Sequence, residues 1–108
     1  MEKKDRVLRQ EVFTPMDLCL RMVRDIPQEK LEDPSATFLD PSCGDGNFLV
    51  ALLQVLTEEY GHDRQEVLPR LYGVEIKEEH LEVAKQRLPG ANLVCADALT
   101  FDYSQFEK

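Results

Sequence analysis

The chain has 108 residues, a length that suits one small domain with a single hydrophobic core. With 43% hydrophobic and 31% charged residues, no long apolar run and no secretion leader, it is expected to be a cytoplasmic domain over residues 1–108, without membrane contact. The net charge of -8, from 13 basic and 21 acidic residues, argues against this chain gripping a DNA backbone alone. Any contact with DNA would then come from residues outside this chain.

The cysteines and histidines do not form a metal-binding pattern. Cys19, Cys43 and Cys95 are odd in number and widely spaced, which fits reduced thiols better than a disulfide framework. Neither His62 nor His80 has a cysteine or another histidine at ligand spacing. We therefore expect no metal site.

The first half of the chain predicts a helix, a loop and a strand. Thr14 and Pro15 suit a helix start, because a hydroxyl can cap free amides and proline has no N–H to lose. Apolar residues then recur at three- and four-residue steps until Pro27, which predicts a helix over residues 15–26. Residues 29–35 are polar and predict a loop, and the apolar residues 36–39 predict a brief strand buried by its neighbours.

The second half alternates helices with strands. Helical spacing begins at residue 47 or 48 and ends near Gly61, a plausible cap. Residues 71–76 predict a second strand, residues 77–88 a helix, and residues 92–96 a third strand. Strands joined by single helices are typical of right-handed βαβ units with a parallel sheet, so the predicted fold class is α/β.

Each predicted strand ends in or is followed by an acidic residue: Asp40, Glu75 and Asp97. In parallel sheets, ligands bind at the carboxyl ends of the strands. One such residue alone is most often solvated or a helix cap. Three of them beside a glycine turn favour a binding site.

The turn after the first strand contains Gly44 and Gly46, which permit close approach of a ligand to the backbone. Amides at a helix start bind a phosphate or a carboxylate equally well. The dinucleotide pattern Gly-x-Gly-x-x-Gly fails here, because Leu49 occupies the third glycine position. Asp40 would suit the ammonium of a methionine moiety and would repel a pyrophosphate.

The remaining two acids suit a nucleoside. Glu75 can accept hydrogen bonds from both ribose hydroxyls, and Asp97 can accept one from an adenine amino group.

Four segments in series resemble one family. Residues 40–49 (DPSCGDGNFL) closely resemble the cofactor-binding loop of DNA adenine-N6 methyltransferases, as found in bacterial restriction-modification systems. Residues 11–15 (EVFTP) look like the element that precedes this loop in the family. Residues 72–76 (YGVEI) and 95–99 (CADAL) are similar to its ribose-binding and adenine-binding elements. The resemblance implies a partial Rossmann-like methyltransferase fold, with about three parallel strands and flanking helices.

The resemblance also implies S-adenosylmethionine as cofactor and assigns its contacts. The residues implied to bind it are Phe13, Thr14 and Pro15 at the methionine end, Asp40, Pro41, Cys43, Gly44 and Gly46 in the loop, Glu75 and Ile76 at the ribose, and Asp97 and Ala98 at the adenine. No base lies near Cys43 in sequence, so it is interpreted as a small turn residue and not as a nucleophile. Phe48 is expected to pack beneath the loop.

The family's catalytic segment, Asp- or Asn-Pro-Pro-aromatic, does not occur in these residues, because no two of the six prolines are adjacent. We assign no catalytic residue and expect this chain alone to be inactive. With a strand order of three, two, one, the edge of strand 36–39 would be open, to be covered by a second polypeptide, a second copy or the C-terminal tail. The alternatives are a non-catalytic binding or regulatory module and part of a methyltransferase acting on another substrate.

Overall fold

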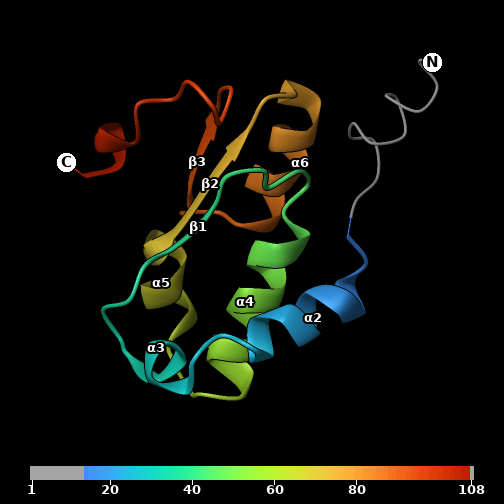
Figure 1. The fold of residues 1–108 in the computed structure, drawn as a ribbon. Helices are drawn as coiled ribbons and strands as arrows, with labels where there is room; N and C mark the ends of the chain where they lie inside the picture. The colour runs from blue at the N-terminus through green and yellow to red at the C-terminus, as the bar shows by residue number, and fades with distance from the viewer. Residues whose placement is uncertain (1–13, 108) are drawn as a thin grey trace.

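The structure is a computed structural model that describes residues 14–107. Its centre is a parallel sheet of three strands, β1 (Phe38–Asp40), β2 (Leu71–Glu75) and β3 (Asn92–Cys95), in the order β1-β2-β3. Strand β2 therefore lies in the middle and β1 at an edge, as Figure 1 shows. The predicted α/β class, a partial Rossmann-like fold, is confirmed.

Helices lie along one side of this sheet (Figure 1). Helix α4 (Asn47–Glu58) connects β1 to β2, and α6 (Glu78–Arg87) connects β2 to β3. Two crossovers of the same hand in strands laid side by side put both helices on the same face. Helix α2 (Met16–Arg24) packs against α4 as a further layer.

The C-terminal part of the described chain lies on the opposite side of the sheet (Figure 1). It ends in the short 3-10 helix η2 (Tyr103–Glu107). The ring of Phe106 packs edge-on against Tyr72 of β2, with centroids 4.8 Å apart. The two faces of the sheet are thus covered very differently.

Helix α4 supplies much of the hydrophobic core because it is apolar on nearly all sides. Its side chains are enclosed between α2 and the sheet, and those fully buried are Leu49, Ala51, Leu52, Val55 and Leu56. Burial of one leucine side chain stabilises a fold by about 1.5–3 kcal/mol. This buried helix therefore anchors the loop that precedes it.

Three expectations for the N-terminal half were wrong. Pro15, with an extended backbone, occupies the position before α2, and no side chain caps this helix, so Thr14 is not its cap. Residues expected to form a loop include the short helix α3 (Gln28–Glu32), which forms because Leu31 is buried in the core. Strand β1 is not fully buried: it lies at the edge of the described sheet, and Leu39 is 45% exposed.

The polar stretch before β2 also contains structure that its sequence did not indicate. It folds as the short helix α5 (Arg64–Val67), followed by the 3-10 helix η1 (Leu68–Arg70). Both Val67 and Leu68 are buried in the main core. Two adjacent apolar residues in a polar stretch were too few to show the spacing of a helix.

Candidate functional site

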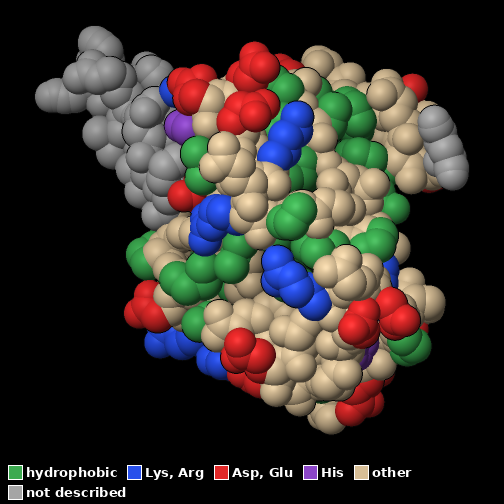
Figure 2. Space-filling view, turned by 180° about the vertical axis from the view of Figure 1, so that it is seen from behind, with side chains coloured by type: hydrophobic (Ala, Val, Ile, Leu, Met, Phe, Trp, Pro, Cys, Tyr) green, Lys and Arg blue, Asp and Glu red, His purple; other side chains and the backbone are tan. Residues whose placement is uncertain are grey.

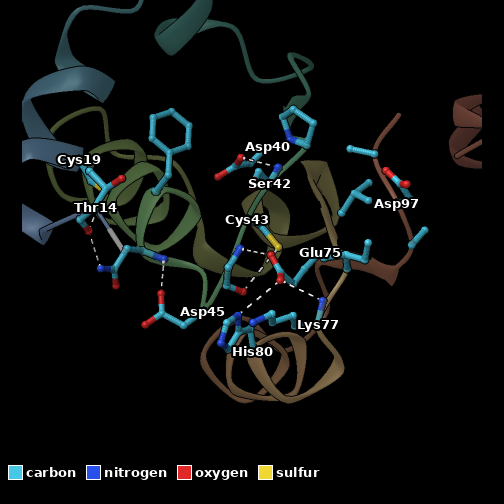
Figure 3. A pocket seen from close by; sticks show the side chains of 18 residues that line it. Thr14, Cys19, Asp40, Ser42, Cys43, Asp45, Glu75, Lys77, His80 and Asp97 are labelled. Carbon is cyan, nitrogen blue, oxygen red and sulfur yellow. Dashed lines mark hydrogen bonds and ion pairs between the residues drawn. The ribbon is translucent and has the colours of Figure 1, made fainter. Parts of the chain in front are cut away.

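The carboxyl ends of the three strands border a cavity of about 690 Å³, shown in Figure 3. Nine of the twelve expected site residues line it: Thr14, Asp40, Pro41, Cys43, Gly44, Glu75, Ile76, Asp97 and Ala98. Pro15 and Gly46 do not line it, and Phe13 lies outside the described residues. Four segments that are distant in sequence therefore meet at one place.

Hydrogen bonds shape the loop after β1 and hold it against β2. Asp40 Oδ1 accepts a hydrogen bond from the amide of Ser42 at 3.0 Å, which closes a local turn. The amide of Cys43 donates to the carbonyl of Val74 at 3.0 Å. The loop thus continues the attachment of β1 to β2 beyond the last paired residue.

Gly46 explains why the loop turns so sharply into α4. It has φ +96, a left-handed conformation that favours glycine, and it directly precedes the helix. A Cβ atom here would lie 3.2 Å from Leu88 Cδ1 and 3.3 Å from Ala84 Cβ. Gly46 therefore permits close packing of the loop on α6 and the residue after it.

Glu75 is the buried carboxylate of the site, with only 7% of its surface exposed (Figure 3). Its Oε1 accepts from the amide of Gly44 at 2.9 Å, and its Oε2 accepts from the amide of Lys77 at 3.0 Å. His80 Nδ1 lies 3.4 Å from Oε2. Because a carboxylate offers about four acceptor positions, Glu75 can hold these groups and still accept from a ligand.

Burial governs the protonation of two further groups in the cavity. It raises the pKa of Asp40, an effect that the hydrogen bond from Ser42 opposes and the nearby Glu75 reinforces. Burial also raises the pKa of Cys43 to about 12, with Asp40 and Glu75 adding to the shift. The Cys43 thiol therefore stays protonated at neutral pH, as suits a small turn residue and not a nucleophile.

The cavity also contains residues that the sequence did not single out as ligands. Lys77 and His80 reach it from the start of α6, and Asn47 from the first position of α4. The position of His80, five residues after Glu75 at a predicted helix start, was a usable signal. Phe48 lines the cavity as well as packing on the core, whereas only packing was expected.

Other site types find no support in the described part of the chain. Residues 14–107 contain no cluster of histidine, cysteine and acidic side chains suited to a metal ion. Across the same range, every helix is too short or too polar to cross a membrane. Cys19, Cys43 and Cys95 are all free thiols.

Comparison with known families shows to which family this chain belongs. The model of the N-6 DNA methylase family matches residues 4–94, most of the chain. The chain belongs to the N-6 DNA methylase family. The resemblance to this family is thereby confirmed over residues 4–94, and it connects this methyltransferase domain with DNA methylation. No curated protein matches the chain significantly.

N-6 DNA methylases normally take their methyl group from S-adenosylmethionine and act on DNA. The matched region contains the glycine loop as well as Asp40 and Glu75. Asp97 lies just beyond it, on the same cavity.

Proposed function

We propose that this chain binds S-adenosylmethionine in the cavity at the strand ends, as the cofactor-binding part of a site-specific DNA adenine-N6 methyltransferase of the restriction-modification type. The observation that carries the proposal is the convergence of Asp40, Glu75 and Asp97 with the glycine loop on one cavity. The free thiols, with Cys95 exposed, suit a reducing cytoplasm.

The residues present fit the methionine end of this cofactor. Asp40 is partly buried, and this burial raises the pKa of its carboxyl. A positive ammonium or sulfonium group beside it would offset the cost of its burial. Thr14, on the segment before α2, borders the same cavity.

The nucleoside end fits as well. The amides of Gly44 and Lys77 orient the Glu75 carboxylate, which can then accept from ribose hydroxyls. Asp97 Oδ1 accepts from the amide of Leu99 at 3.0 Å, which fixes that carboxylate at the cavity wall. Ile76, an apolar side chain that is 62% exposed beside Glu75, offers an apolar surface for the nucleoside.

When bound, the cofactor supplies an electrophilic methyl group. The residues of this chain bind and align it, and in such a transfer alignment of donor and acceptor is the main contribution of the protein. Methylation of adenine N6 also requires a flipped base whose amine is polarised by acceptors. We place these functions, and hence catalysis, on residues outside these 108, which lack adjacent prolines.

DNA contact is also placed outside this chain. The net charge is -8, and Figure 2 shows acidic and basic side chains interspersed over the described surface in that view, without a continuous basic area. Proteins hold DNA phosphates largely with lysine and arginine clusters.

A methyl-transfer assay tests whether DNA contact and catalysis lie outside this chain. Incubation of this chain with labelled S-adenosylmethionine and DNA should give no transfer above background. Robust transfer would contradict the placement of both functions on other residues.

Binding is tested by calorimetric titration with S-adenosylmethionine. We expect the wild type to bind, and Glu75→Ala and Asp97→Ala to bind at least tenfold more weakly. The reason is that a hydrogen bond to a charged group contributes about 1.5–3 kcal/mol. Equal affinity in all three proteins, or binding by none, would show that the cavity is not this cofactor site.

The open edge of the sheet gives the second part of the proposal. Strand β1 pairs with β2 and lies at the edge of the described sheet. The C-terminal segment packs on Tyr72 of β2 and makes no backbone hydrogen bond to β1 within the described residues. We therefore propose that a second polypeptide or a second copy of this chain covers the edge, instead of the tail.

A further inference from the structure

Arg87, at the end of α6, contacts the cofactor loop from outside the cavity. Its Nη1 donates to the carbonyl of Asp45 and to Asn47 Oδ1, both at 2.9 Å, and lies 3.5 Å from Asp45 Oδ1. The residue does not itself line the cavity. One guanidinium thus holds both the turn of the loop and the first residue of α4.

Asn47 passes this contact on to the segment that precedes α2. Its Nδ2 donates to the carbonyl of Thr14 at 2.8 Å, across 33 positions of sequence (Figure 3). The orientation of this amide follows from its neighbours. Arginine has only donors and a carbonyl only accepts, so the opposite orientation would lose both bonds.

We propose that Arg87 and Asn47 are positioning residues that set how closely the Thr14 segment lies over the methionine end of the bound cofactor. We name the series of contacts Arg87, Asn47 and Thr14 the clip. This inference rests on the proposed function and adds residues that the resemblance did not assign. The clip joins α6, α4 and the segment before α2. A ligand in the cavity would need these three parts of the chain in fixed relative positions.

Within the described residues, the Asn47 amide makes the main hydrogen bond to the Thr14 carbonyl. The other contact to this carbonyl in the described part of the chain comes from Cys19 Sγ at 3.7 Å, and a thiol is a weak donor. The next residue, Pro15, has no N–H with which to fix the segment. Loss of the Asn47 amide should therefore free Thr14 while the buried part of α4 stays in place.

The test is Asn47→Asp, a change of almost no volume. The aspartate keeps an acceptor for Arg87 but cannot donate to Thr14, and it sets an oxygen against that carbonyl. We expect affinity for S-adenosylmethionine to fall about tenfold. Affinity for 5′-methylthioadenosine, which lacks the amino-acid end, should stay within twofold of the wild type. Asn47→Ala should show the same selective loss.

The matched control is Asn92→Asp. Asn92 Nδ2 also donates to backbone carbonyls, those of Pro69 at 2.8 Å and Leu71 at 3.3 Å, but away from the cavity. Its substitution should leave both affinities unchanged. Equal losses for both compounds in Asn47→Asp, no loss at all, or the same loss in Asn92→Asp would overturn the clip.

A second measurement needs no ligand. The amide of Cys19 donates to the carbonyl of Pro15 at 3.0 Å in the first turn of α2. At the end of α6, the amide of Leu88 donates to the carbonyl of Ala84 at 2.9 Å. Asn47→Asp should speed hydrogen exchange at Cys19 and not at Leu88. Unchanged exchange at Cys19 would overturn the clip, whereas failure of the wild type to bind either compound would overturn the proposed function.

Discussion

Asp40 and Glu75 are carboxylates on the same cavity with different surroundings. Two backbone amides hold Glu75, whereas Asp40 accepts one, from Ser42. Burial raises the pKa of Asp40, so the folded protein binds this proton more tightly than the unfolded chain does. The stability of the unliganded protein should therefore fall as pH rises through this pKa, starting just above the ordinary aspartate value of about 3.9.

Burial favours the protonated form of Asp40, whereas a cationic ligand favours its ionised form. The affinity for such a ligand should therefore depend on pH. The ammonium and sulfonium favour the ionised carboxylate, so binding releases a proton and S-adenosylmethionine should bind more tightly as pH rises through that pKa. Asp40→Asn should weaken binding at neutral pH and flatten this dependence. Calorimetry across a pH series measures both, with Asp25→Asn, an exposed aspartate, as control. The same pH dependence in Asp40→Asn as in the wild type would exclude Asp40 as its source.

At the level of elements, the junction between the loop and α4 depends on one glycine. Gly46→Ala places a side chain at φ +96 and against Leu88 and Ala84. Backbone strain of about 1–2 kcal/mol and overpacking of about 1–3 kcal/mol should together lower the free energy of unfolding by about 2–5 kcal/mol.

Gly61→Ala separates these two effects. Gly61 follows α4 with φ +73, but a Cβ there would meet nothing within 4 Å. We expect this variant to lose about 1–2 kcal/mol, from strain alone. Urea unfolding of both variants measures the difference, and equal losses would mean that packing on α6 does not constrain Gly46.

For the whole molecule, the main feature is the unequal cover of the sheet. Helices cover one face, and on the other an aromatic cluster from the C-terminal segment packs on Tyr72. Leu39 of the edge strand stays 45% exposed. Exposed apolar edge strands favour pairing with another chain.

The purified chain should therefore self-associate through β1 unless a partner is added. Leu39→Lys should shift light-scattering masses toward the monomer, because a charge on an edge strand opposes pairing. Leu99→Lys is the control, since Leu99 is 93% exposed but lies outside the sheet. A monomer at all concentrations, with rapid hydrogen exchange along β1, would contradict cover of this edge.

Local patterns of residues were enough to predict the alternation of strands and helices, the parallel sheet and the place of its acidic strand ends. These features could be predicted because they depend on residues close together in the chain. The spacing of apolar residues shows the strands and helices, and the glycine turn before an apolar helix is equally local. Local patterns failed at Leu31, which is buried in the main core, and at Leu39, which is exposed on the edge strand, because both depend on contacts with distant parts of the chain.

Contacts across long stretches of chain had to come from the folded molecule. Arg87 reaches Asp45 across 42 positions, and Asn47 reaches Thr14 across 33. A polar side chain on a helix looks the same in sequence whether it faces water or a loop carbonyl. Its partner is set by how α6, α4 and the segment before α2 pack on the sheet, and no spacing within any one of them encodes that arrangement.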